Sequence, residues 1–244
     1  MHYLIPLGEF GYLVYRAFGT LRYAIRDRDR LIYQLNHVGV NSIPLVALIG
    51  LFAGGIVAWQ AAYQFKGMVS LSVLGGQVVR VMMMEMAPVL TALVMSGRIG
   101  ASMTAEIGAM RISEQIDALK SMSIDPVRYI VMPRFLAMVI MMPVLTFFSI
   151  LIAVFGAFLV SHYFLDITQQ VFFDSVRSFF MIGDLVGGLL KGAVFGILIS
   201  LIGCYRGMKT TGGARGLGHS TIQAFVISAI AILLSDFLLW IILF

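Results

Sequence analysis

Two carboxylates stand inside apolar runs of the sequence, where an ionised group is costly. Glu85 lies within the run Val78–Ser96, and Asp236 lies in the last apolar run. A charge at the centre of a bilayer costs about 2.5–3.5 kcal/mol on insertion scales, so such acids usually serve a function. Pro88 follows Glu85 by three residues and should bend the helix, which favours a substrate pathway at Glu85. The alternative for Glu85, and the expectation for Asp236, is a buried carboxyl that pairs with a neighbour and serves packing.

Aromatic and methionine side chains near these acids could enclose an apolar ligand. Methionine side chains adapt to flexible apolar ligands, and a methionine run surrounds Glu85. Alternatively, the methionines face lipid or fill the core, and the aromatic residues at the end of the first apolar run form an ordinary belt at the membrane interface. The candidates for a lipid cavity are Trp59, Tyr63, Val81, Met84 and Glu85.

A polar stretch with helical periodicity, residues 105–120, follows the second apolar run. Glu106, Glu114 and Asp117 fall on or near one face of the expected helix. The stretch is either a solvated loop helix or a coupling helix that inserts into a cleft of a separate ATPase. For the second alternative, the contact residues are Glu106, Arg111, Glu114 and Asp117.

Charged neighbours within this stretch are expected to pair, Arg111 with Glu114 and Asp117 with Lys120. Glu114, Ile130 and Pro133 also keep the spacing of the cytoplasmic loop motif of ABC importers, although Lys120 stands where that motif has glycine.

The sequence gives little support for an enzyme. It contains no H-E-x-x-H, G-x-S-x-G or paired C-x-x-C motif, and its four histidines lie in different expected loops or termini. We therefore expect no catalytic residue, no metal and no cofactor on this chain. It also has no nucleotide-binding motif, so any ATP hydrolysis is expected on a partner polypeptide.

Composition indicates a polytopic α-helical membrane protein. The 244 residues are 60% hydrophobic and 12% charged, whereas a soluble domain has about 25% charged residues. Several stretches exceed the roughly 20 apolar residues that cross a bilayer. No aromatic-basic cluster supports nucleic-acid binding, although the net charge is +5.

The expected elements form a single domain over residues 1–244. An amphipathic basic helix over 1–35 is expected to lie in the membrane interface or to pack on the cytoplasmic flank. A further short segment, 162–184, is expected on the outer surface. The five transmembrane helices are expected at 43–65, 76–104, 130–161, 185–205 and 220–243.

Basic residues predict the orientation. With a cytoplasmic N-terminus, thirteen of the seventeen lysines and arginines fall on the cytoplasmic side, and the C-terminus ends outside. The other four are expected on the outer side or at span ends near it: Lys66, Arg80, Arg177 and Lys191.

Small residues recur every fourth position in two spans. They are Gly50 and Gly54 in the first span, and Gly188, Gly192, Gly196 and Ser200 in the fourth. Small faces allow membrane helices to approach closely. The sequence leaves open whether they pack within one subunit or form a dimer seam.

Taken together, the motifs resemble the MlaE/YrbE family of ABC permeases, which work with MCE-domain proteins in lipid transport. The similarity extends in order along nearly the whole chain. It includes Gly50–Gly54, Glu85–Leu93, Gly97–Ala101, Ala105–Arg111, Glu114–Leu119, Asp125-Pro126, Pro133-Arg134, Gly212–Gly218 and Asp236.

The resemblance implies a homodimeric permease in the bacterial inner membrane, with five spans per subunit. Two ATPases would lie below it in the cytoplasm and an MCE ring above it in the periplasm, with phospholipid in a cavity between the permease subunits. Glu85 would lie at that cavity, and Glu106–Leu119 would be the coupling helix. Some members carry an arginine just before the acid, where this chain has Met84.

We therefore expect the membrane subunit of an ABC-type lipid transporter. Two alternatives remain open: a proton-coupled secondary transporter using Glu85 and Asp236, and an ABC importer of a small solute.

Overall fold

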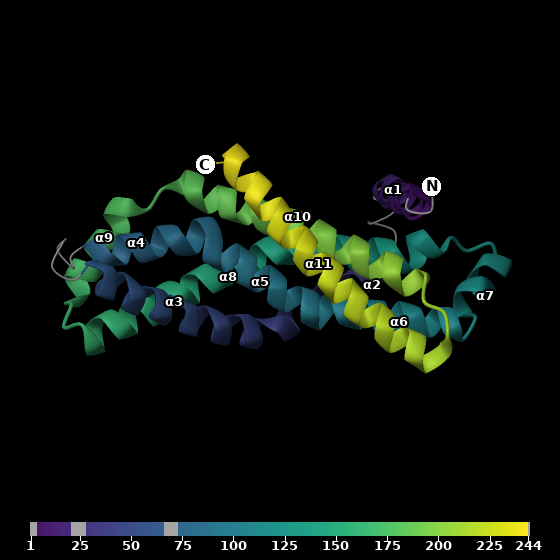
Figure 1. The fold of residues 1–244 in the computed structure, drawn as a ribbon, viewed down its shortest axis with the longest axis horizontal. Coiled ribbons are helices and arrows are strands. Elements are labelled where there is room, and N and C mark those ends of the chain that lie inside the picture. The colour runs from purple at the N-terminus through teal and green to yellow at the C-terminus, as the bar shows by residue number, and fades with distance from the viewer. Residues whose placement is uncertain (1–3, 21–27, 66–72, 244) are drawn as a thin grey trace. The chain divides into compact units, whose positions relative to one another are not determined.

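Helices make up the regular structure of the part of the chain described by the computed structural model, residues 4–20, 28–65 and 73–243 (Figure 1). In a bilayer core the backbone must satisfy its own hydrogen bonds, and an α-helix does so within one segment. Five helical stretches are long and apolar enough to cross a membrane. The expected all-α polytopic fold is therefore confirmed over these residues.

The candidate spans extend beyond the apolar runs from which they were predicted. They cover Arg28–Gln64, Leu74–Ile112, Val127–Phe164, Ile182–Met208 and Gly213–Leu243. Apolar residues mark only the part of a helix inside the hydrocarbon, whereas the hydrogen-bond ladder continues through polar turns at either end.

The elements of the first half of the chain are mostly short. They are α1 (Leu4–Gly19), α2 (Arg28–Val38), the 3-10 turn η2 (Val40–Ser42), α3 (Ile43–Phe65), α4 (Leu74–Val81), η4 (Met82–Met86), α5 (Ala87–Met95), η5 (Ser96–Gly100), α6 (Ala101–Ile112) and α7 (Gln115–Ser121). The second half contains η6 (Val127–Val131), α8 (Met132–Phe164), α9 (Gln169–Phe179), α10 (Ile182–Met208) and α11 (Gly213–Leu243).

The region expected as one N-terminal helix over 1–35 contains two described helices, α1 and α2. Through η2, α2 leads into α3, so the first candidate span begins at Arg28 rather than near residue 43. Residues 1–3 and 21–27, with Arg22 and Arg26, lie outside the described residues, as does Lys66. The interfacial placement of this region stays a prediction.

Three π-helical turns, η4, η5 and η6, interrupt the long spans. In η4 the Ala87 N–H donates to the Met82 carbonyl, five residues back. Two of these turns end two residues before a proline, Pro88 after η4 and Pro133 after η6. Proline has no N–H to donate to the carbonyl four residues earlier, and a wider turn accommodates that loss. The bend expected at Pro88 thus takes the form of a π-helical turn that contains Glu85.

Contacts divide the chain into two units. Unit 1 comprises Met1–Val40, Ala92–Met141 and Ala193–Ser235. Its core joins α1, α6, α7, η6, α8 and α10 through buried apolar side chains, among them Leu13, Ile107, Ile116, Ile130 and Phe135. The short helix α7 is therefore anchored to transmembrane elements by Ile116.

Unit 2 comprises Asn41–Thr91, Met142–Gly192 and Asp236–Phe244. Its core joins α3, α4, η4, α8 and α9, and its buried members include Ala58, Val78, Met82, Met83 and Phe172. Met82 and Met83, the first two residues of the methionine run, thus fill this core.

Glycines permit close backbone approach inside unit 2. A Cβ on Gly54 of α3 would lie 1.9 Å from the Ala153 carbonyl oxygen of α8, and one on Gly188 of α10 would lie 2.1 Å from the Met83 carbonyl oxygen. Neither position can carry a side chain without moving backbone. At Gly54 and Gly188, therefore, the small residues serve packing within the chain.

Candidate functional site

A charged cluster joins three elements of unit 2 around one buried lysine. The Lys191 Nζ atom of α10 lies 2.7 Å from Glu85 Oε1 of η4 and 2.9 Å from Asp236 Oδ1 of α11. The Lys191 side chain is fully buried, whereas 32% of the Glu85 side chain is exposed. The ring of Trp240, also on α11, lies 5.2 Å from Nζ. One cation is thus shared by two carboxylates and an aromatic face.

This arrangement explains how three ionisable groups can remain inside membrane-spanning helices. An isolated buried charge is strongly unfavourable, whereas a paired and hydrogen-bonded one can be retained. Lys191 donates a hydrogen bond to Glu85, and it holds Asp236 at ion-pair distance. Removing the lysine would leave two carboxylates facing each other without a counter-charge.

Lys191 differs from the expectation that it lies on the outer side or at a span end. It lies nine residues after the first residue of α10 and has no solvent-exposed surface. Its signal was visible in the sequence, since a lysine within an apolar span predicts a partner acid, and two such acids were already identified. The packing role expected for Asp236 agrees with this contact, and the sharing of one cation by Asp236 and Glu85 was missed.

A second ion pair lies in the same unit. The Arg80 Nε atom of α4 lies 3.1 Å from Asp184 Oδ2 of α10, and the Asp184 side chain is nearly buried. Arg80 had also been expected on the outer side or at a span end. The Arg80–Asp184 and Glu85–Lys191 ion pairs together join the α4–η4 stretch to α10.

An apolar groove of about 660 Å³ lies between α3 and α8. Trp59 is 53% exposed, and its ring meets the Phe164 ring edge-to-face at 6.0 Å between centroids. The groove is lined by Leu51, Phe52, Gly55, Ile56, Trp59, Gln60, Gly156, Leu159, Val160 and Phe164. Pockets of this size with almost entirely apolar walls suit hydrophobic ligands.

The structure does not gather the five lipid-cavity candidates at this groove. Of the five, Trp59 alone belongs to its lining. Tyr63 and Val81 are exposed, Met84 is half-buried, and Glu85 is engaged with Lys191. A separate apolar cavity of about 470 Å³ is lined by Met83, next to Met84, together with side chains of α8 and α9. Met83 rather than Met84 lines this cavity, and the assignment of Met84 to a lipid cavity stays a prediction.

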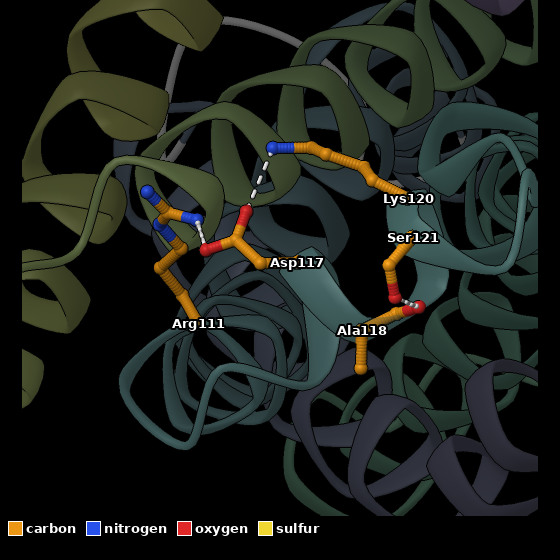
Figure 2. A network of polar contacts seen from close by, with 5 residues as sticks. All are labelled: Arg111, Asp117, Ala118, Lys120 and Ser121. Atoms are coloured by element: carbon orange, nitrogen blue, oxygen red, sulfur yellow. Dashed lines mark hydrogen bonds and ion pairs between the residues drawn. The ribbon is translucent and has the colours of Figure 1, made fainter.

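The polar stretch after the second span forms an elbow, defined here as residues 111–125. Asp117 Oδ2 lies 2.6 Å from Arg111 Nη1, and Asp117 Oδ1 lies 2.9 Å from Lys120 Nζ (Figure 2). The pKa of Asp117 lies below its ordinary value. The hydrogen bond from Lys120 is the largest cause, and the hydrogen bond from Arg111 is the second. The expected Asp117–Lys120 pair is confirmed.

The expected pairing of Arg111 with Glu114 is wrong, because the helix does not continue through Glu114. Glu114 has a φ of 59°, in the left-handed region, and α7 begins after it. This reversal removes the three-residue helical spacing and leaves Arg111 to bind Asp117 across the break. The single coupling helix expected over 105–120 is therefore the end of α6 followed by the short α7.

A second left-handed residue ends α7. Ser123 has a φ of 60°, its N–H donates to the Lys120 carbonyl, and the Ile124 N–H donates to the Leu119 carbonyl. These two bonds are those of a Schellman motif, usually built with glycine. The elbow thus has a defined backbone path at both ends of α7.

Glu106, the remaining coupling candidate, lies in α6 and faces α8. Its carboxylate accepts hydrogen bonds from Arg134 Nη2 at 2.9 Å and from Ser102 Oγ at 3.1 Å. It therefore ties the helix before the elbow to the helix after it.

Two ion pairs hold helix α1 to the rest of unit 1. Arg16 Nη2 donates to Asp125 Oδ2 at 2.8 Å, at the end of the elbow, and Glu9 Oε2 lies 2.6 Å from Lys209 Nζ after α10. The hydrogen bond from Lys209 lowers the pKa of Glu9. Among the described residues, no group of three or more potential metal ligands was found.

Comparison with known proteins gives consistent matches over most of the chain. The family profile described as Permease MlaE matches residues 31–242. A probable ABC transporter permease protein of Rickettsia felis is 39% identical over 233 residues, which cover 96% of this chain and 90% of that protein. A probable ABC transporter permease protein of Synechocystis is 38% identical over 213 residues, with 87% and 81% covered.

A plant protein is also similar. TRIGALACTOSYLDIACYLGLYCEROL 1, chloroplastic, of Arabidopsis thaliana is 34% identical over 206 residues, which cover 84% of this chain and 59% of the plant protein.

Proposed function

The chain belongs to the MlaE permease family of ABC transporters, and from this membership we propose that it moves phospholipid between the bacterial inner membrane and a periplasmic MCE-domain protein. In this proposal ATP is hydrolysed by a separate ATPase subunit. The permease forms a homodimer, with its N-terminus in the cytoplasm and its C-terminus in the periplasm.

The observation that carries the lipid assignment is the groove between α3 and α8. Its volume of about 660 Å³ and its apolar walls suit an acyl chain, and the Trp59 ring forms part of the wall. The name of the Arabidopsis relative contains that of a galactolipid, which also favours a lipid cargo.

Transmission from the ATPase is assigned to the elbow. Its outer surface carries Glu114 and the Arg111–Asp117–Lys120 network, and its inner surface carries Ile116, buried in the core of unit 1. A push on α7 is therefore passed to η6 and α8 through packed side chains. ATP binding would shift the population between two shapes of the lipid cavity, one that accepts lipid and one that releases it.

The two alternatives have different standing. A secondary transporter that works alone does not fit membership in an ABC permease family. In addition, Glu85 and Asp236 are both engaged by Lys191. An importer of a small solute remains the competing function, and its cargo distinguishes it.

Affinity purification in mild detergent followed by lipid mass spectrometry tests the proposal. We expect an ATPase and an MCE-domain protein to co-purify with the chain, and we expect phospholipid to be retained. Recovery of a soluble-solute binding protein in place of the MCE protein, with no lipid retained above that on an unrelated membrane protein, would contradict the lipid assignment.

A further inference from the structure

The charged residues of α1 lie on the face of the helix that packs against the rest of unit 1. Glu9, Leu13, Arg16 and Ala17 follow the three-and-four spacing of a single helical face. Leu13 is 6% exposed and Ala17 is fully buried, whereas Tyr15, off this face, is 77% exposed. The helix therefore directs its charges toward the protein and leaves an aromatic ring outside.

Arg16 reaches the joint between the elbow and η6. Its Nη2 atom donates to Asp125 Oδ2 at 2.8 Å, across 109 residues of sequence. Asp125 Oδ1 accepts from the Val127 N–H at 3.0 Å, and the Asp125 carbonyl accepts from the Tyr129 N–H at 3.0 Å. Pro126, the next residue, has a fixed φ. Arg16 thus contacts a point of the chain that the surrounding backbone already holds in place.

Glu9 attaches the other end of this face to the end of α10. Its Oε2 atom lies 2.6 Å from Lys209 Nζ and accepts from the Tyr205 hydroxyl at 3.3 Å. Tyr205 belongs to α10, and Lys209 is the first residue after that helix. Between the two ends, Leu13 packs into the same apolar core as Ile116 of α7. Within unit 1, α1 therefore connects the elbow with the end of α10.

We propose that α1 is a brace between the elbow and α10, and that Arg16 is a positioning residue that acts through Asp125 when ATP hydrolysis is coupled to transport. Apolar packing is non-directional, so the core alone does not fix the end of the elbow along α1. A charge-assisted hydrogen bond at each end of α1 supplies that direction. The inference rests on the ATPase-coupled part of the proposed function and is independent of the cargo.

The test uses the full chain in complex with its ATPase, reconstituted in vesicles that contain fluorescent phospholipid. Arg16→Gln and Asp125→Asn each remove the ion pair, and asparagine at 125 can still accept from the Val127 N–H. Arg28→Gln is the matched control, because Arg28 is largely exposed and lies 3.9 Å from Asp29. The ATPase rate, the phospholipid transferred per ATP and the thermal unfolding midpoint are measured for each variant.

The Arg16 and Asp125 side chains are 37% and 31% exposed, so the expected effect is modest. We expect phospholipid transferred per ATP to fall about two- to fivefold in each single variant and no further in the double variant, because both changes break one contact. Arg16→Lys keeps the charge and should recover most of the loss, and Arg28→Gln should match wild type. A wild-type ratio in Arg16→Gln, or losses that multiply in the double variant, would overturn the proposal. A lower unfolding midpoint with an unchanged ratio would also overturn it, because Arg16 would then serve folding alone.

A second measurement needs no transport and applies even if Asp125→Asn does not fold. A spin label at Met122, an exposed residue of the elbow, reports the mobility of the elbow in the purified permease. Arg16→Gln should raise this mobility and Arg28→Gln should leave it unchanged, and equal mobility in the two variants would overturn the brace. Failure of the proposed function shows instead in the wild type, which would then bind no ATPase, whereas failure of this inference shows as variants that match a coupled wild type.

Discussion

The ammonium nitrogen of Lys191 lies 2.7 Å from a carboxylate oxygen of Glu85, which ties the middle of α10 to the π-helical turn before Pro88. The same ammonium holds Asp236 of α11. Lys191, which the sequence had placed on the outer side or at a span end near it, thus lies where three membrane-spanning elements meet.

Replacing Lys191 with methionine should destabilise the chain by about 3–5 kcal/mol, because it leaves two carboxylates buried without their counter-charge. The triple variant Lys191→Met, Glu85→Gln, Asp236→Asn removes all three charges and should recover most of that loss. The thermal unfolding midpoint of the purified chain in detergent measures both. A triple variant no more stable than the single variant would show that the charges are not coupled.

Charge reversal on the elbow should separate ATP hydrolysis from transport. In the complex with its ATPase, Glu114→Lys combined with Asp117→Lys removes the acidic surface of α7 and places new cations beside Arg111 and Lys120. We expect the proposed homodimer to remain assembled, ATPase activity to persist and lipid transfer to stop. The matched control is Asp166→Lys with Asp174→Lys, two exposed acids outside the elbow. Normal transfer in the elbow variant would remove the coupling assignment.

Glu114→Gly should separate the backbone role of this residue from its side-chain role. A non-glycine residue in the left-handed region costs roughly 1–2 kcal/mol, so glycine should raise the unfolding midpoint. The same variant loses the carboxylate offered to the ATPase, so coupling should weaken. Glu114→Ala loses the carboxylate without relieving the strain and serves as the control. A glycine variant less stable than the alanine variant would contradict the strain argument.

Acidification should loosen the elbow through Asp117. Its pKa is lowered in the folded state, first by Lys120 and then by Arg111, so its stabilising effect is complete above the ordinary value of 3.8. That effect is lost as pH falls from 3.8 through the lower folded value. A spin label at Met122 should therefore gain mobility in that range, and Asp117→Asn should show the higher mobility already at neutral pH. The pKa of Glu9 is also lowered, so Glu9 also titrates at acidic pH. Comparison with Asp117→Asn separates the contribution of the elbow from that of Glu9. Unchanged label mobility across this range would contradict the network.

A photo-crosslinker at Trp59 should capture phospholipid, because Trp59 lines the apolar groove of about 660 Å³. The same probe at Met122, an exposed residue of the elbow, provides the comparison. Capture of neighbouring protein alone at Trp59 would mean that the groove is a packing surface between subunits.

Long-range pairing limited what the sequence could predict. The five spans follow from long, mostly apolar runs, and Pro88 indicated a local irregularity that the structure contains. The partner of Glu85 could not be read from local spacing, because Lys191 is 106 residues away. Arg111 was paired with the wrong acid because nothing in the residue types around Glu114 indicates a left-handed backbone there.

The candidate site was predicted in part for the same reason. Trp59 lines the apolar groove between α3 and α8, and its contact with lipid stays a prediction. Met84 was included from the methionine run and Glu85 from its carboxylate before Pro88. Neither signal points to the groove between α3 and α8, whose lining includes Gly55 of one helix and Gly156 of the other.

The wide turn over Met82–Met86 has a consequence for how this protein tolerates insertions and deletions. A π-helical turn contains about one residue more than an α-helical turn, so deleting a single residue there would convert it to ordinary helix. The residues on either side of the turn would keep their orientation about the helix axis, because the turn already absorbs the extra residue, and Arg80 would still face Asp184. A deletion in the regular helix beside Val81 has no such buffer: it would rotate Arg80 by roughly 100° relative to Glu85, so only one of the two ion pairs with α10 could survive.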